Sequence, residues 1–115
     1  EFTRIALLRN RSVTSRFMPP QRPLSLVVVD ATRSSLLPDV LSRPPETAPV
    51  FIPANEPFRL RVFVDRSVVE VFVNGRQCVA VRVHPSRDDS IGVSLLAQGQ
   101  DAELKSLDAW HMGSI

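Results

Sequence analysis

Hydrophobic and polar residues alternate along residues 58–83, which is the period of a β-strand whose two faces meet different surroundings. The segment FRLRVFV alternates first, a turn at Asp65-Arg66-Ser67 follows, and VVEVFV resumes the pattern. Pairing Val64 with Val69 also sets Val62 opposite Val71, so the register is consistent. The pattern predicts an antiparallel pair with one apolar face, made by Phe58, Leu60, Val62, Val64, Val69, Val71 and Val73.

A hairpin loop at Val73-Asn74-Gly75 is expected to lead into a third strand, because Gly75 can take a positive φ. A loop with an odd number of residues places Val79, Val81 and Val83 on the apolar face. An even loop would turn Arg82 and its neighbours inward instead. The odd loop is favoured, since it avoids burying a charge.

Other segments extend the strand pattern. Thr3–Arg9 and Leu24–Ala31 are expected to form another antiparallel pair, and the apolar run LSLVVVDA predicts burial on both faces of its strand. Ser90–Ala97 and Ala102–Met112 complete the predicted meander, whereas Ser34–Leu41 is expected to form one short helical turn at most. Turns recur about every ten residues, which is typical of an antiparallel sandwich.

We therefore expect an all-β fold, an antiparallel two-sheet β-sandwich of jelly-roll or concanavalin-like type. The chain has 115 residues, a length that suits one domain, and residues 1–115 are expected to form a single β-sandwich domain. The formal net charge of +2 is too small to indicate a nucleic acid or membrane partner. The single cysteine, Cys78, excludes an internal disulfide. No signal peptide or transmembrane run is expected in the chain, and the sequence leaves its compartment open.

The opposite face of the predicted meander is mixed, with arginines and aromatic rings around Glu70. In the proposed register Glu70 lies near Arg61 and Arg82, and a cross-strand ion pair is its favoured role. Three interpretations of such a face are open: it is exposed to solvent, it docks onto another domain, or it binds sugar. Trp110 is expected to pack in a core rather than offer a sugar platform. The candidate domain-interface or sugar-contact residues are Arg61, Phe63, Glu70, Phe72, Arg82 and Trp110.

Asp65 and Glu70 are the first candidates for catalysis, because a retaining glycosidase needs two carboxyl groups roughly 5 Å apart. The predicted register argues against this role, since Asp65 sits in the turn and Glu70 on the sheet face. His84 and His111 are far apart in sequence, without the spacing of metal ligands. We therefore expect no catalytic residue, no cofactor and no metal in this chain.

Four segments resemble motifs of glycoside hydrolase family 32, which contains invertases, levanases, inulinases and other β-fructofuranosidases. DRSVVEVF (65–72) looks like D-x-S-x-V-E-x-F, and RVHP (82–85) is similar to R-V-Y-P. AWHMGS (109–114) resembles W-x-M-x-S, and DATRSSL (30–36) resembles D-x-S-R-S-S-L. The matches follow family order and together span roughly Thr3 to Ile115.

These motifs all belong to the C-terminal β-sandwich of that family, whose catalytic carboxylates lie in a preceding five-bladed β-propeller. The propeller motifs N-D-P-N-G, R-D-P and E-C do not occur here. The resemblance implies a non-catalytic module that supports or docks a propeller acting on sucrose or fructans, in cis or in trans. The alternatives are a stand-alone, lectin-like carbohydrate-binding sandwich and an independent hydrolase. A sheet edge or an apolar face that no propeller covers would favour association of the chain into a homo-oligomer.

Overall fold

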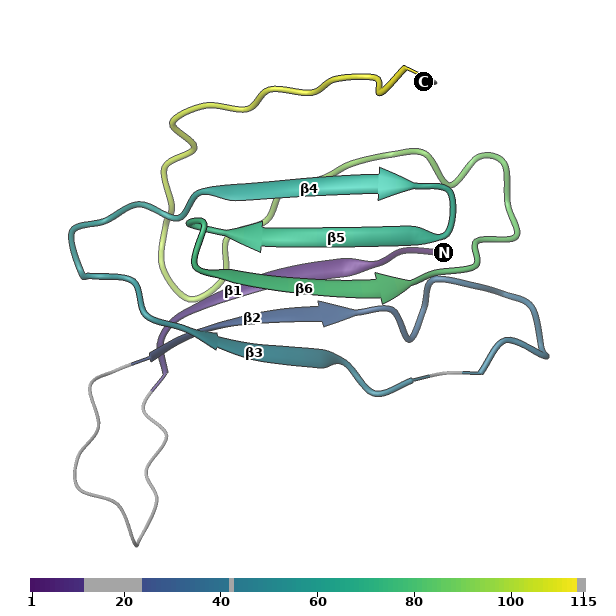
Figure 1. The fold of residues 1–115 in the computed structure, drawn as a ribbon, viewed down its shortest axis with the longest axis horizontal. Helices are drawn as coiled ribbons and strands as arrows, with labels where there is room; N and C mark the ends of the chain where they lie inside the picture. Colours follow the sequence, from purple (N-terminus) through teal and green to yellow (C-terminus); the bar gives the residue numbers. More distant parts are fainter. Residues whose placement is uncertain (12–23, 42, 114–115) are drawn as a thin grey trace, which may run out of the picture.

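The structure, a computed structural model, describes residues 1–11, 24–41 and 43–113, and it places six strands there in two antiparallel sheets (Figure 1). The first sheet has the order β1-β2-β3, and the second has the order β4-β5-β6. No helix occurs among the described residues, so none could cross a membrane. The all-β fold of two stacked antiparallel sheets is thus confirmed. The strands are β1 (Arg4–Arg11), β2 (Leu24–Asp30), β3 (Glu46–Val50), β4 (Leu60–Asp65), β5 (Val68–Val73) and β6 (Gln77–Arg82).

The first sheet contains the strand pair expected near the N-terminus. β1 and β2 are antiparallel, with Leu7 opposite Val27 and an irregularity between Leu8 and Arg11. In β2, Ser25, Val27 and Val29 are buried, whereas the side chains between them are only half-buried. The expected burial on both faces is therefore wrong for one face, because β2 lies in a sheet that the second sheet covers on one side only.

β3 was not expected, because the sequence before it contains Pro44 and Pro45 and the strand itself contains Pro49. Proline lacks the N–H that a central strand must donate, so it is confined to sheet edges and bulges. β3 pairs with β2 alone, with Pro49 opposite Leu26, and it forms an edge of its sheet. The edge position reconciles the proline with a strand.

The register of the second sheet is confirmed. Val64 faces Val69, Val62 faces Val71, and Val71 also faces Val79. Val73 pairs with Gln77, so three residues form the loop, and the odd count places the valines of β6 on the apolar face. Gly75 has φ +64°, as expected, and Asn74 takes a left-handed φ of 52° as well.

The core lies where β6 contacts β3 and β2, between the two sheets. Its members are mostly valines, whose branched side chains suit a pleated surface. Half-buried residues from both sheets pack around it, as does Phe58, which precedes β4. The buried apolar residues are Val27, Val29, Val50, Ile52, Val69, Val71, Val73, Val79 and Val83.

Two of the expected strands are absent from the structure. Ser90–Ala97 and Ala102–Met112 form no strand, and the segment 90–113 follows an extended course outside both sheets (Figure 1). Alternation alone cannot form a strand, because a strand needs a neighbour that accepts and donates its backbone hydrogen bonds. Ser34–Leu41 forms bends and a turn closed by the Val40 N–H and the Leu37 carbonyl, within the limit of one short helical turn at most.

Candidate domain-docking surface

The outer face of the β4-β5-β6 sheet gathers five of the six predicted site residues. Arg61 lies opposite Phe72, Phe63 lies opposite Glu70, and Arg82 lies opposite Val68. The rings of Phe63 and Phe72 meet edge to face, with centroids 5.8 Å apart and planes at 88°. This geometry matches the attraction between the positive edge of one ring and the negative face of the other.

Glu70 does not form the ion pair that the sequence pattern favoured. Neither Arg61 nor Arg82 comes within 4 Å of its carboxylate, and the two ion pairs among the described residues are Glu56–Arg76 and Arg87–Asp89. The direct neighbours of Glu70 across the strands are Phe63 and Ala80. The arginines occupy positions diagonal to Glu70, where neighbours on adjacent strands are roughly 7–8 Å apart. At that separation an arginine contacts the carboxylate only if both side chains extend toward each other.

Trp110 is not with the other predicted residues. It belongs to the segment 90–113, and its side chain is 78% exposed, so the expected packing in a core is wrong. Every large apolar side chain from Ile91 to Met112 is likewise between 58% and 88% exposed. A core position requires a partner surface, and this segment pairs with neither sheet.

β4 is exposed along its whole length, on both of its faces. Its outer side chains are Arg61, Phe63 and Asp65. Its inner side chains, Leu60, Val62 and Val64, are 44%, 38% and 61% exposed although they continue the apolar face of the core. β4 is also the edge of its sheet, so alternate backbone N–H and C=O groups point away from β5. We call β4 together with Phe72 the β4 surface.

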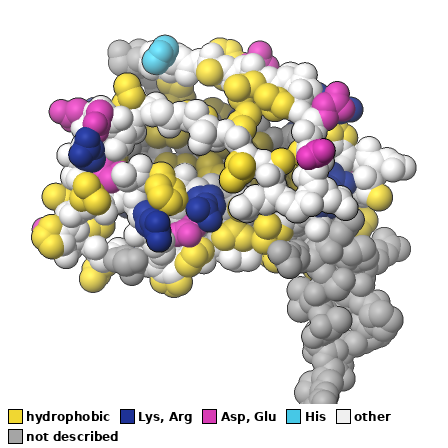
Figure 2. Space-filling model, turned by 180° about the vertical axis from the view of Figure 1, so that it is seen from behind, with side chains coloured by type: hydrophobic (Ala, Val, Ile, Leu, Met, Phe, Trp, Pro, Cys, Tyr) yellow, Lys and Arg dark blue, Asp and Glu magenta, His cyan; other side chains and the backbone are white. Residues whose placement is uncertain are grey.

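Apolar side chains also line a hollow that is visible from the back of the molecule (Figure 2). Large contiguous apolar patches are uncommon on monomeric soluble proteins.

Asp65 is the last residue of β4 rather than a turn residue, and the turn consists of Arg66 and Ser67. By strand alternation Asp65 shares the outer face with Glu70. Both carboxylates are on an open sheet, and neither lines either of the two cavities described next.

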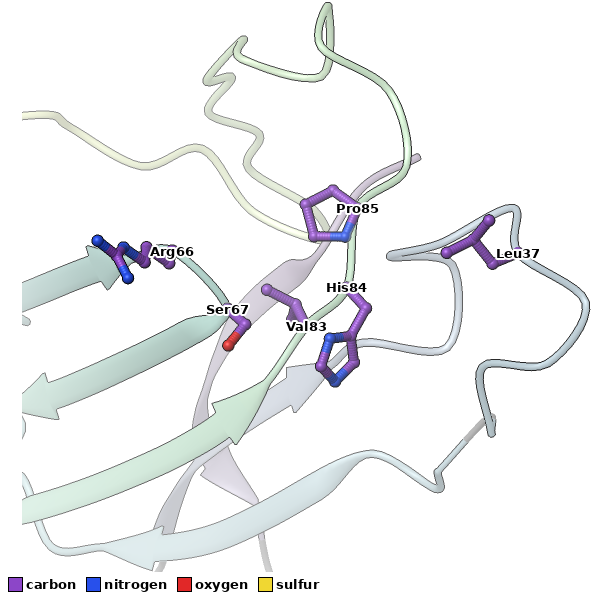
Figure 3. Close-up of a pocket in the computed structure, with 6 residues that line it drawn as sticks. All are labelled: Leu37, Arg66, Ser67, Val83, His84 and Pro85. Atoms are coloured by element: carbon purple, nitrogen blue, oxygen red, sulfur yellow. The ribbon is translucent and has the colours of Figure 1, made fainter.

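The first cavity, of about 380 Å³, lies where the β4–β5 turn approaches the end of β6. Figure 3 shows Leu37 facing His84 and Pro85 across it, while Arg66 extends away from the other lining residues. The second, of about 440 Å³, lies between the sheets beside Arg43, Glu46 and Arg82. Neither cavity brings two carboxylates together.

A polar cluster that the sequence did not predict ties the two sheets together. The Arg76 guanidinium donates two hydrogen bonds to the Glu56 carboxylate, at 2.8 and 3.0 Å, and the Asn74 amide donates another at 2.8 Å. These donors, Arg76 first, lower the pKa of Glu56. Asn74 also exchanges hydrogen bonds with the Arg59 backbone, at 2.9 Å each.

Arg9 of β1 completes this cluster from the other sheet. Its guanidinium donates to the carbonyls of Ala54 and Glu56, at 2.9 and 2.7 Å, and lies 4.5 Å from the centroid of the Phe58 ring. The Asn74-Gly75 dipeptide predicted the turn at this site. Nothing local in the sequence indicated that Arg9, 47 residues from Glu56, would reach it.

Comparison with known proteins assigns the chain to a family. The family described as "Glycosyl hydrolases family 32 C terminal" matches residues 22–111, and the chain therefore belongs to it. The chain is 34% identical over 105 residues to a fructan 6-exohydrolase of Beta vulgaris, which covers 84% of the chain. It is 36% identical over 98 residues to a β-fructofuranosidase, insoluble isoenzyme 1, of Oryza sativa subsp. indica, which covers 79%.

A levanase of Bacillus subtilis (strain 168) is 46% identical over 63 residues, 54% of the chain and 9% of the levanase. The matches to the fructan 6-exohydrolase and the β-fructofuranosidase each span 16% of those proteins. No solved structure matches. The resemblance seen in the four motifs is thus confirmed as family membership.

Proposed function

We propose that residues 1–115 form a non-catalytic β-sandwich module of a β-fructofuranosidase-like glycoside hydrolase. Its role is to dock onto and support a catalytic β-propeller that acts on sucrose or fructans. Membership of the family 32 C-terminal domains supports the role, and the names of the similar proteins, a fructan exohydrolase, a β-fructofuranosidase and a levanase, support the substrate class.

The exposure of β4 is the observation that carries this proposal. An edge strand with three apolar side chains on one face and an aromatic residue and an arginine on the other combines the residue types that are enriched at interface cores. Its free backbone edge also offers hydrogen bonds to a strand or loop of a partner. An uncovered surface of this composition favours a partner over solvent.

The occupant we assign to the β4 surface is the catalytic domain. The chain spans about one sixth of the two longer relatives, so most of each relative lies outside the region that this chain matches. Arg61 and Glu70, which have no ion-pair partner in the sheet, are suited to pair with opposite charges on that domain.

The position of the two candidate carboxylates supports the non-catalytic part of the proposal. Glycosidase acids have raised pKa values because apolar walls enclose them, and the nucleophile must face the same bound sugar. Asp65 is exposed, Glu70 is half-exposed, and the sheet around them is open. The chemistry is therefore assigned to the catalytic domain.

Co-expression with a family 32 catalytic domain that lacks its own C-terminal region tests the proposal. We expect the two chains to co-elute in size-exclusion chromatography, and the melting temperature of the catalytic domain to rise when the module is bound. The double variant Val62→Glu/Phe63→Glu should abolish co-elution, because it places charge on both faces of β4.

Thr47→Glu is the matched control, since Thr47 is an exposed residue of a strand in the other sheet. It should leave the complex intact. A complex that forms equally well with the double variant would contradict docking through β4, and so would a wild-type chain that never co-elutes with the catalytic domain.

One observation favours carbohydrate binding as a second function. Phe63 is 37% exposed, follows Arg61 on the outer face of β4 and lies opposite Glu70, so an aromatic ring stands beside groups that bind hydroxyls. Titration with sucrose, inulin and levan, followed by calorimetry and amide chemical shifts, tests this function. Shifts confined to Phe63 and its neighbours, and lost in Phe63→Ala, would support it, whereas an absence of heat and shifts would exclude it.

A further inference from the structure

The carboxylate of Glu1 is held by five hydrogen-bond donors from two loops. The backbone N–H groups of Leu36, Ser86 and Arg87 donate to it at 2.9, 2.9 and 3.1 Å. The hydroxyls of Ser86 and Ser90 donate at 2.5 and 3.0 Å. Successive backbone N–H groups that converge on one oxyanion form an anion-binding nest, and this arrangement adds two hydroxyls to it.

The loop that supplies most of these donors is itself braced. The Arg87 guanidinium forms an ion pair with Asp89, and the Ser90 N–H donates to the Arg87 carbonyl at 3.3 Å. The guanidinium is thus engaged inside the loop, and it is the backbone of Arg87 that binds Glu1. Backbone donors fixed in this way select an anion by geometry rather than by long-range charge alone.

The neighbouring residue is held independently. The Phe2 N–H donates to the Arg33 carbonyl at 2.8 Å. The guanidinium carbons of Arg4 and Arg33 lie 5.7 and 5.9 Å from the centroid of the Phe2 ring, within cation–π range. Arg33 and Leu36 belong to the connection between β2 and β3, so this connection contacts both Glu1 and Phe2.

The hydrogen bonds also account for the acidity of Glu1. Its pKa falls to about 2, chiefly because of the Ser86 hydroxyl; burial acts in the opposite direction, and the N–H groups of Ser86 and Leu36 and the Ser90 hydroxyl add to the lowering. Donors that bind the ionised form stabilise it against protonation.

We propose that the Leu36 N–H and the loop 86–90 form a binding site for a carboxylate, and that Glu1 is its occupant. The site fastens Glu1, ahead of β1, to the β2–β3 connection and to the loop from which the segment 90–113 departs. Its ligand class is a planar carboxylate with both oxygens engaged. The inference stands on these contacts and does not depend on the proposed docking role.

The variant Glu1→Ala in the 115-residue chain empties the site without touching either sheet, since β1 begins at Arg4. We expect hydrogen exchange, measured by mass spectrometry, to accelerate several-fold in peptides covering 34–37 and 84–90 and to stay unchanged in β5. Glu103→Ala, which removes an exposed carboxylate from the segment 90–113, is the control and should leave all three regions unchanged.

Sodium acetate then distinguishes a binding site from a general loosening of the N-terminus. In Glu1→Ala, acetate should restore slow exchange in 84–90 in a saturable way, and sodium chloride at equal ionic strength should not. Unchanged exchange in Glu1→Ala would overturn the proposal, and so would an effect of acetate no greater than that of chloride.

Discussion

The inner face of the β4-β5-β6 sheet has a closed part and an open part, built from the same kind of residue. Val71 and Val73 of β5 are fully buried, whereas Val62 and Val64 of β4 are 38% and 61% exposed on the same face. The other sheet reaches β6 and covers the valines of β5, but it leaves β4 uncovered. An alternating pattern therefore defines an apolar face but does not specify which other part of the molecule covers it.

The largest expected effect is a difference in stability loss between a variant in the closed part of the inner face and a variant in the open part. Val71→Ala should lower the free energy of unfolding by about 2–3 kcal/mol, because it removes two buried methyl groups and leaves a cavity. Val62→Ala should cost about 1 kcal/mol or less, since its side chain is already partly in water. Urea denaturation of both variants measures the contrast, and equal losses would mean that the inner face of β4 is covered in solution.

Asn74→Ala tests how much Asn74 contributes to stability by fixing the residues that precede β4, whose two faces are exposed. We expect a loss of about 1–2 kcal/mol, from the side-chain hydrogen bonds to the Arg59 N–H and the Glu56 carboxylate and from the strain of a left-handed φ at alanine. Asn74→Gly keeps the φ and loses the same hydrogen bonds, so it should cost less. If alanine and glycine cost the same, the backbone strain has no part in the effect.

Charge on the open part should change association more than stability. Val62→Glu is expected to alter the unfolding free energy by less than about 1 kcal/mol, because the new side chain can reach water. Without its partner domain, the wild-type chain should self-associate at high concentration through β4, and Val62→Glu should weaken this association. Sedimentation velocity checks both; a wild-type chain that stays monomeric throughout would contradict the association.

The smallest expected effect concerns pH and lies outside both parts of the sheet. The pKa of Glu1 is about 2 in the folded chain and 4.5 ordinarily, so its contribution to stability is complete above pH 4.5 and is lost as the pH falls toward 2. The charged groups that couple to it electrostatically are Arg87 and Asp89.

A pH series of unfolding curves for the wild type and Glu1→Gln measures this contribution. The stability difference between the two chains should be constant above pH 5 and shrink below pH 4.5. A difference that persists unchanged at pH 2 would show that the Glu1 carboxylate is not the group responsible.

The sequence predicted the strands whose partners lie next to them along the chain. The register from Val64 to Val83 followed from alternation and two short turns, which leave a hairpin little freedom. β3 was missed because Pro49 argues against a strand unless the strand is known to be an edge. The strands expected between Ser90 and Met112 were wrong because nothing local specifies whether a suitable edge lies within reach.

The candidate site was predictable to a similar extent. Alternation placed Arg61, Phe63, Glu70, Phe72 and Arg82 on one face, and the structure agrees. The ion pair of Glu70 failed because register fixes backbone positions and not the direction of long side chains. Glu1 and Glu56, in contrast, bind groups that only the tertiary fold brings near them.

Hydrogen exchange of β4 tests the central claim most directly, namely that β4 is the surface that docks onto the catalytic domain. In the isolated chain, amides of Leu60–Asp65 that point away from β5 should exchange much faster than those of Val68–Val73, which lie between two strands. In the complex with a family 32 catalytic domain, we expect the β4 amides to become protected and the β3 amides to gain no protection. Equal exchange of β4 with and without the catalytic domain would contradict it.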